Sequence, residues 1–495
     1  MPPQGRPREA SALAYGDLAF GFASAESEAA RAPELLRDGF MDRWHTDSAS
    51  VPGGDFLILG YKGSGKSAIA EHLRLRAESN PLEFVKSTYL ASDFQFGLVG
   101  DLAEGVGDRP GAYVAVWLWL LLLQVLDSIS HDEQAMIQSE LARTVSALRQ
   151  IGLLPTSSLR ATALASRKKS VTVNLPQVLK LSLEEVQQVR RGSVALLVDE
   201  LMAAVTAAQT TSRHVITVDG LDEIYLRSPP EYDIVSALMM AADRLNAEML
   251  RTATPVKVLV LCRTDVFERL PGANKNKIRQ DSALELDWYQ NTRHPERTAL
   301  VQLANLKVSA THEGIDDLFS RFFPERLQVG SQQFSTLRYL IEHTRHTPRD
   351  FLQLLKALLD FAPPNGALSP SDMLSGLRKY CVDYFVPEIK DELIGPLTSE
   401  QVDAVFGLLG SLPRRKFDFA AVDAEASRNV RYQELDWPRA LGLLFEASAI
   451  GNQQTRYGGT AYYTFKYRNP HSRLSFSRRM ILHRAVAKAL NLLDN

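Results

Sequence analysis

The sequence predicts an α/β fold with a parallel sheet, followed by an α+β domain near the C-terminus. Three apolar runs of fully buried type support the sheet: 56-FLIL-59, 214-HVITVD-219 and 256-VKVLVLCR-263. The last two are separated by a helical pattern over 232–250. Strands that alternate with helices form parallel sheets, and such sheets bind ligands at the carboxyl ends of their strands. We therefore expect functional residues where these runs end.

Composition sets the broad class. The 495 residues are 45% hydrophobic and 23% charged, with a formal net charge of -2, so no global charge indicates a polyanionic partner. Cys262 and Cys381 lie too far apart in sequence for a disulfide framework or a metal-ligand spacing, which favours a reducing compartment. The N-terminus lacks an apolar stretch of signal-peptide length. We expect a cytoplasmic protein.

The segment 112-AYVAVWLWLLLLQVL-126 is apolar except for Gln124. Its fifteen residues fall short of the roughly twenty that a membrane-spanning helix needs. We interpret it as a buried helix that is covered on all sides, by helices that precede Ser212, and we expect no membrane partner.

The first apolar run leads into an octet, 60-GYKGSGKS-67, that matches G-x-x-x-x-G-K-[ST], with a helical pattern after it. Glycines let backbone N–H groups approach a phosphate closely, and the helix adds its positive N-terminal end. Lys66 would reach the β- and γ-phosphates of ATP, and the Ser67 hydroxyl would bind Mg²⁺. The alternative is a chance glycine-rich turn. The residues predicted to contact the nucleotide are Gly60, Gly63, Ser64, Gly65, Lys66, Ser67 and Ala68.

Phosphoryl transfer also needs an acid near the Mg²⁺ ion, which we expect at the end of a strand beside the phosphate-loop strand. Asp219 ends the run Val215–Val218 and opens the sequence 219-DGLDE-223. The position after Asp219 is Gly220, so Asp222 and Glu223 become the candidates for orienting the attacking water. A solvated acidic turn is the alternative for these two residues.

Two arginines are candidates for sensing the γ-phosphate. Arg263 ends the run 256–263, where a cation near a phosphate would distinguish triphosphate from diphosphate. The alternative is an arginine paired with a nearby carboxylate. Arg349, in 347-TPRDFLQLLKALL-359, lies in the first turn of a predicted helix and could reach the site from a helical lid.

The pattern predicts four segments: an N-terminal segment over 1–50 that borders the nucleotide site, a core over 51–295 with a helical insertion at about 100–210, a helical lid over 296–362, and a winged-helix-like domain over 371–495. Further strands are expected at 83–90 and 282–288, and a hairpin is possible within 168–186.

The C-terminal domain is predicted from the order helix, strand, helix and hairpin. A capping box at Thr398 begins the first helix. The expected strand at 415–422, helix at 437–450, and hairpin strands at 461–468 and 473–477 follow. This order is compatible with a winged helix.

Taken together, the octet, the DGLDE strand end, the strand ending in arginine and the T-P-R helix start resemble the STAND class of AAA-related P-loop ATPases, which contains NACHT proteins. More narrowly, the chain resembles a bacterial group of P-loop ATPases labelled FunZ-like, which also has segments similar to FKYRNP and ILHRAVAKAL. The resemblance covers roughly residues 15 to 360 in outline.

The resemblance implies a Mg²⁺-dependent ATPase in which Asp219 holds the metal, Asp222 or Glu223 positions water, and Arg263 and Arg349 are sensors. It also implies a role in bacterial regulation or antiviral defence, with assembly into a homo-oligomer or binding to an effector protein. The sequence departs from the class by carrying Thr347 where STAND proteins often have glycine, and by lacking a long repeat array.

The C-terminal segment is basic and contains aromatic residues, a combination that fits a nucleic-acid surface. The alternative is a hairpin with a buried aromatic face and solvated arginines. From Arg456 to the C-terminus the only acid is Asp494. The cations are Arg456, Lys466, Arg468, Arg473, Arg478, Arg479, Arg484 and Lys488. Its aromatic residues are Tyr462, Tyr463, Phe465, Tyr467 and Phe476.

Three functional hypotheses remain. The first is a slowly hydrolysing ATPase that acts as a nucleotide-dependent switch. The second is a DNA-stimulated ATPase with a basic winged-helix tail. The third, a small-molecule kinase, is disfavoured because the chain is far longer than that fold needs.

Overall fold

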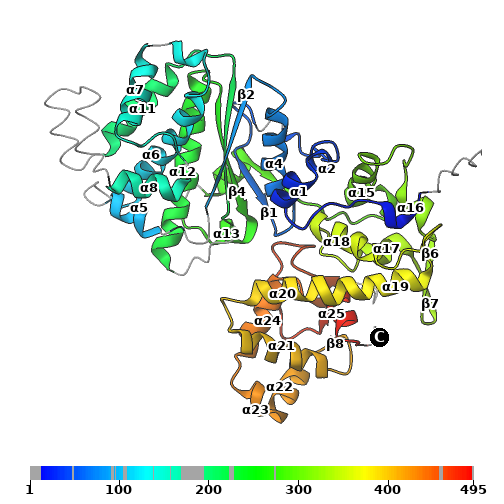
Figure 1. Cartoon of the computed structure of the whole chain (residues 1–495). Helices are drawn as coiled ribbons and strands as arrows, with labels where there is room; N and C mark the ends of the chain where they lie inside the picture. The colour runs from blue at the N-terminus through cyan, green and yellow to red at the C-terminus, as the bar shows by residue number, and fades with distance from the viewer. Residues whose placement is uncertain are drawn as a thin grey trace, which may run out of the picture. The chain divides into compact units, whose positions relative to one another are not determined.

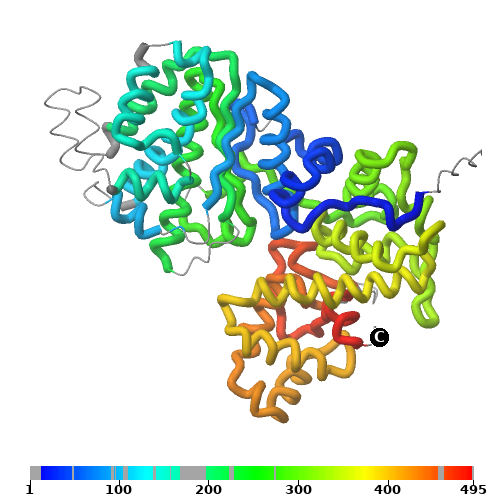
Figure 2. The backbone as a smooth tube through the Cα atoms, in the orientation of Figure 1, coloured from blue at the N-terminus to red at the C-terminus, as the bar shows by residue number. Residues whose placement is uncertain are grey.

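The computed structural model describes residues 13–46, 50–90, 94, 96–103, 109–137, 139–156, 158–168, 194–221, 228–272, 275–455 and 461–492. The chain divides into two compact units (Figures 1 and 2). The sheet unit comprises Ser24–Arg37 and Met41–Asp287. The C-terminal unit comprises Met1–Ala23, Asp38–Phe40 and Trp288–Asn495. The predicted hairpin within 168–186 lies almost wholly outside the described residues.

Within the described residues, the sheet unit contains a five-stranded parallel sheet. The strands, in spatial order, are β2 (Glu83–Tyr89), β3 (Arg213–Asp219), β4 (Val256–Arg263), β1 (Leu57–Gly60) and β5 (Ala283–Glu285). The predicted parallel sheet is confirmed. The strand expected over 282–288 is shorter than predicted, because the chain turns after Glu285, where the Asp287 amide donates to the Glu285 carbonyl at 3.1 Å.

The strand order corrects one expectation. The acid-bearing strand β3 does not lie beside β1, because β4 is inserted between them. Seven of the eight residues of β4 are buried, whereas β2 and β5 are mostly half-exposed. A strand that is apolar on both faces belongs in the centre of a covered sheet, and half-exposed strands belong at its edges.

Helices cover both faces of this sheet, as a parallel sheet requires (Figure 1). Helix α4 (Lys66–Ala77) packs on one face, and α6 (Arg109–Ile129) and α12 (Pro229–Arg251) pack on the other. The other helices among the described residues of the sheet unit are α1 (Ala25–Arg31), α2 (Pro33–Arg37), α5 (Phe96–Ala103), η2 (Ala135–Ile137), α7 (Ser139–Gln150), α8 (Leu159–Lys168), α11 (Val194–Thr206), α13 (Thr264–Arg269) and α14 (Lys275–Ser282).

Among the described residues, one helix is long and apolar enough to cross a membrane: Pro110–Ile129, within α6. It is longer than the apolar run of the sequence, because Asp127 and Ser128 continue the helix. Of its apolar window, 89% is buried, against α5, α8, α11 and α12. The predicted buried helix is confirmed, and α12, which follows Ser212, also covers it.

The C-terminal unit begins with helices and a small hairpin. The N-terminal segment lies alongside them (Figure 2), and the Tyr15 hydroxyl donates to the Leu355 carbonyl at 2.9 Å. The elements are η1 (Tyr15–Asp17), η3 (Pro295–Arg297), α15 (Ala299–Ser309), α16 (Leu318–Phe322), β6 (Arg326–Val329), β7 (Gln332–Ser335), α17 (Thr336–Ile341), α18 (Pro348–Leu359), α19 (Pro370–Lys379), the π-helix η4 (Tyr380–Phe385) and α20 (Val386–Leu393).

The last part of this unit combines helices with an antiparallel sheet. Its described strands form a four-stranded antiparallel sheet in the order β10-β9-β11-β8. The capping box at Thr398 is confirmed. The elements are α21 (Ser399–Ser411), β8 (Lys416–Phe417), α22 (Phe419–Arg428), α23 (Val430–Gln433), α24 (Trp437–Glu446), β9 (Ile450–Thr455), β10 (Ala461–Thr464), β11 (Met480–Leu482) and α25 (Arg484–Ala489).

Three strand predictions in this region need correction. The strand over 415–422 is only two residues long, because the Asp418 carboxylate accepts from the Ala421 amide and caps α22. The chain over 473–477 is not a strand; β11 begins later, at Met480. The hairpin partner of β10 is β9 (Ile450–Thr455), where no strand was predicted and only Ile450 was expected, at the end of a helix.

Candidate nucleotide-binding site

The glycine-rich octet forms the loop between β1 and α4. Gly63 and Gly65 have φ angles of 79° and 98°, a left-handed region that favours glycine. The Ser64 amide donates to the Tyr61 carbonyl at 3.1 Å and closes the turn. Gly65 is also the N-cap of α4, so the helix starts at Lys66, as predicted.

The first glycine is required for a different reason. A Cβ on Gly60 would lie 2.2 Å from the Ser64 Oγ and 3.2 Å from the Leu286 Cβ. The Gly60 carbonyl accepts a hydrogen bond from the Lys66 Nζ at 3.1 Å, and the Tyr61 carbonyl accepts one at 3.4 Å. Lys66 is 3% exposed, so the loop holds its ammonium group against its own carbonyl oxygens.

The loop presents the N-terminus of a twelve-residue helix at the carboxyl edge of a parallel sheet. The first N–H groups of α4, including those of Ser67 and Ala68, have no partner within the helix and carry its positive dipole end. Such a terminus binds phosphate. This is a P-loop NTPase fold.

Arg263 lies next to the loop. It ends β4 and pairs in register with Gly60 of β1. Its guanidinium donates through Nε and Nη2 to the two carboxylate oxygens of Asp265, each at 2.9 Å. Burial alone would raise the pKa of Asp265, but the charge and hydrogen bonds of Arg263 outweigh it and lower that pKa. The carboxylate-paired arginine that the sequence left open is therefore present beside the phosphate loop.

Asp219 ends β3 and is 7% exposed. Its Oδ1 accepts from the Gly220 amide at 2.7 Å. Because β4 lies between β3 and β1, and strands are spaced about 5 Å apart, Asp219 lies about 10 Å across the sheet from β1. This separation suits an acid that contacts a hydrated Mg²⁺ ion through water better than one that binds phosphate directly.

The turn after Asp219 depends on glycine. Gly220 has a φ of 91°, and a Cβ there would lie 2.4 Å from the Leu90 carbonyl oxygen. The Leu90 amide in turn donates to the Asp219 carbonyl at 2.7 Å, which ties the ends of β2 and β3 together. Asp222 and Glu223 lie outside the described residues.

No family model matches the chain, and no curated protein matches it. Among solved structures, the chain is similar to the Aeropyrum pernix Orc1 protein, which was solved in complex with DNA. That similarity has a TM-score of 0.35 at 12% sequence identity, and it covers 93% of this chain and 92% of the Orc1 chain.

Arg349 belongs to the C-terminal unit, where it is half-buried in the first turn of α18. The preceding Thr347 caps this helix, because its hydroxyl accepts from the Asp350 amide at 3.2 Å. A glycine at this position, as in many STAND proteins, could not form that bond. Thr347 therefore stabilises the start of α18 as its N-terminal cap.

A buried ion pair beside Arg349 was not predicted. The Arg345 Nε and Nη2 donate to the two carboxylate oxygens of Asp350 at 2.9 and 3.1 Å, and the Arg345 Nη1 donates to Glu392 at 2.7 Å. The Tyr384 hydroxyl of η4 donates to Asp350 at 3.2 Å. The run 343-HTRHTPRD-350, unusually rich in charge for a buried helix start, was the signal that could have revealed it.

Buried histidines surround the same segment. His346 stacks on Tyr467 with ring centroids 5.3 Å apart, and the His483 Nε2 lies 3.2 Å from the Thr344 carbonyl oxygen. Burial, reinforced by the charge of Arg468, lowers the pKa of His346 to about 3. Burial also lowers the pKa of His483 well below its usual value. The start of α18 is therefore packed directly against the C-terminal hairpin region.

The basic C-terminal segment is only partly available to a ligand. Arg456 lies outside the described residues. Phe465 is 2% exposed and Tyr467 9%, and they pack with Ile481 and with the half-buried Tyr463. The alternating aromatic residues thus form a buried face of the hairpin region, which is the alternative that the sequence left open.

Proposed function

We propose that this protein is an ATP-binding, slowly hydrolysing P-loop ATPase of STAND type that acts as a nucleotide-dependent switch. The observation that supports it best is the phosphate loop, with glycines in left-handed conformations, Lys66 held at the base and the N-terminus of α4 beyond it. A Cβ built on Gly65 meets nothing within 4 Å, so the loop faces open space rather than protein at this position.

The residues present fit ATP and Mg²⁺. The N–H groups of Gly63 and Gly65 would hold the phosphates, and Lys66 would exchange its carbonyl contacts for phosphate oxygens. Ser67 and Asp219 would hold Mg²⁺, directly and through water, as a hard cation prefers. The bound ion neutralises charge that develops on the phosphates.

The other acids and arginines have supporting roles. Asp222 or Glu223 would position the attacking water, and Arg263 would sense the γ-phosphate from its place in register with Gly60. To sense the γ-phosphate, Arg263 would have to be partly released from Asp265. The ion pair between Arg263 and Asp265 would therefore depend on the nucleotide state. Arg349 would be a second sensor on the helical lid.

The contacts of α18 support the proposed switch role. The helix that carries Arg349 also carries Asp350, which accepts from Tyr384 of η4 and pairs with Arg345. Arg345 in turn donates to Glu392 of α20. A change at the start of α18 would therefore be transmitted to the winged-helix-like domain. We propose that this change controls self-assembly or an effector protein, in bacterial regulation or antiviral defence.

The phosphate loop is tested by Lys66→Ala, because removal of the ammonium group removes its charge-assisted contacts with the phosphates. We expect the variant to fold and to lose at least most of its affinity for a fluorescent ATP analogue, together with Mg²⁺-dependent ATP hydrolysis. Lys62→Ala, at a variable position of the same octet, is the matched control and should bind normally.

Unchanged nucleotide affinity in folded Lys66→Ala would refute the assignment. Hydrolysis by the wild-type protein should be measured with and without duplex DNA. A rate that does not change with DNA supports the switch, and a steep increase supports the DNA-stimulated ATPase instead.

A further inference from the structure

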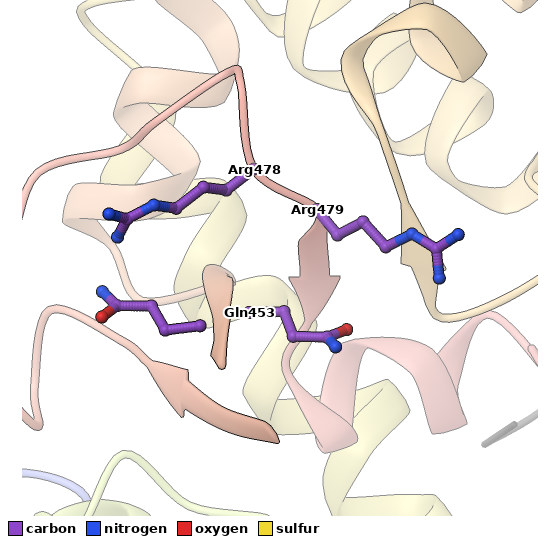
Figure 3. Close-up of a pocket in the computed structure, with 4 residues that line it drawn as sticks. Gln453, Arg478 and Arg479 are labelled. Carbon is purple, nitrogen blue, oxygen red and sulfur yellow. The ribbon is translucent and has the colours of Figure 1, made fainter. Parts of the chain in front are cut away.

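A hollow of about 380 Å³ opens beside the C-terminal antiparallel sheet (Figure 3). Its lining comes from β9 and from the residues just before β11. We call it the β9–β11 pocket, and its lining residues are Gln453, Gln454, Arg478 and Arg479. It belongs to the C-terminal unit, whereas the phosphate loop belongs to the sheet unit.

The backbone that carries these arginines is fixed by a buried asparagine. Asn452 is 2% exposed, its Nδ2 donates to the Ser475 carbonyl at 3.0 Å, and its Oδ1 accepts from the Ser475 amide at 2.8 Å. The Gln453 amide also donates to the Arg479 carbonyl at 2.8 Å. The pocket is therefore built on an ordered strand end, and little backbone entropy remains to be lost when a ligand binds.

Three other cations of this region contact groups of the protein itself. The Lys466 ammonium is mostly buried and lies 3.2 Å from the Glu446 carboxylate. Arg468 lies over the Phe465 and Tyr467 rings, and its Nε donates to the Tyr467 hydroxyl at 3.0 Å. Arg484 lies 3.1 Å from Glu342. These three side chains leave little charge for an external partner.

The arginines of the pocket differ from them. Arg478 and Arg479 are exposed, as is Arg473 on the same segment, and within the described residues no carboxylate pairs with any of the three. The sequence between Glu446 and Asp494 contains no acid. In a chain with a net charge of -2, this is a local positive field.

The directions of the side chains indicate the shape of the partner. Figure 3 shows Arg478 and Arg479 extending away from each other, with Gln453 on the Arg479 side. In these orientations the two guanidinium groups face separate positions, which suits contacts to separate phosphates of an extended chain better than contacts to one small phosphate. Arginine and glutamine side chains both donate to phosphate oxygens.

The aromatic residues indicate a duplex rather than a single strand. Single-strand binding depends on exposed rings that stack on bases. Here Phe465 and Tyr467 are buried, and the partly exposed Phe476 packs edge-on against Phe419 with centroids 5.2 Å apart. We propose that the β9–β11 pocket binds the sugar-phosphate backbone of double-stranded nucleic acid, independently of base sequence.

This proposal goes beyond the ATPase and does not depend on it, so its test contains no nucleotide. The experiment is a fluorescence-anisotropy titration of the full chain with labelled duplexes of two unrelated sequences and with a single strand, over a salt series. The variants are Arg478→Gln/Arg479→Gln, the charge-preserving Arg478→Lys/Arg479→Lys, and the control Arg431→Gln, which changes an exposed arginine on α23 of the same unit.

We expect the glutamine variant to bind both duplexes more weakly by the same factor. The slope of log K against log salt should shrink by about 1.8, or about 0.9 for each lost contact. The lysine variant and Arg431→Gln should keep the wild-type slope. A thermal melt of each sample verifies folding.

Four outcomes would overturn the proposal. The first is a wild-type protein that binds no duplex at low salt, and the second is a folded glutamine variant with the wild-type slope. The third is inorganic phosphate displacing the duplex more strongly than chloride does at equal ionic strength, which would assign the pocket to a free phosphate. Tighter binding of the single strand than of the duplexes would also contradict it.

Discussion

At the scale of single residues, Gly65 in the loop after β1 and Gly220 in the turn after β3 show how the backbone shapes the candidate site. Gly65 and Gly220 have nearly the same φ, 98° and 91°, but different surroundings. A Cβ at Gly65 would meet nothing within 4 Å, whereas at Gly220 it would lie 2.4 Å from a backbone carbonyl oxygen that cannot move aside cheaply.

We therefore predict that Gly220→Ala destabilises the protein more than Gly65→Ala does. In both variants an L-residue in the left-handed region costs roughly 1–2 kcal/mol. In Gly220→Ala the new Cβ must in addition push the end of β2 away from the turn after β3. Urea unfolding monitored by far-UV circular dichroism measures the difference. Equal urea midpoints of unfolding for the two variants would contradict this prediction, because they would show that the Leu90 backbone moves aside at little cost.

At the scale of elements, the ion pair between Arg345 and Asp350 connects α18 to η4 and α20. Burial alone would raise the pKa of Asp350, but the charge and hydrogen bonds of Arg345 outweigh burial and lower that pKa. Asp350 is completely buried and Arg345 is 7% exposed. Removing one partner leaves the other as a buried charge without compensation.

Asp350→Ala should accordingly lower the free energy of unfolding by roughly 3–5 kcal/mol. The matched control is Glu425→Ala, which breaks the exposed pair with Arg428, 3.2 Å apart, and should cost less than about 1 kcal/mol. Chemical denaturation followed by tryptophan fluorescence compares them. Similar losses of unfolding free energy in the two variants would mean that the buried ion pair does not hold α18 to η4 and α20.

At the scale of the whole molecule, the C-terminal unit contains a set of buried neutral histidines. Burial lowers the pKa of His343 and His483 well below the usual value, and lowers that of His346 to about 3. Below about pH 6.5, histidines of the unfolded chain bind protons that the folded chain does not. Their contribution to stability is complete above that pH and is lost as pH falls toward the folded pKa.

We predict that acidification from about pH 7.5 to about pH 5 destabilises the protein by about 2 kcal/mol through His346, and further through His343 and His483. His346→Asn should remove one of these contributions, because asparagine tolerates the φ of 56° found there and does not titrate. Denaturant unfolding at both pH values measures the change. An identical pH dependence in wild type and His346→Asn would contradict the assignment.

The sequence by itself determined the local features of this protein. The octet, its flanking strand and helix, the strands ending in Asp219 and Arg263, and the buried helix around Gln124 were all predicted correctly, because apolar runs and glycine spacing are local patterns. The capping box at Thr398 was predicted for the same reason: a cap depends on residues three positions apart.

The tertiary structure decided which of these features meet. The sequence could not show that β4 separates Asp219 from β1, because strand order depends on which strand must be buried on both faces. Nor could it distinguish Arg468, which lies over the rings of Phe465 and Tyr467, from Arg478 and Arg479, which remain exposed. Whether an arginine is free to bind an external ligand depends on the residues that pack against it. For Arg468 these include Tyr289, which is far away in the chain.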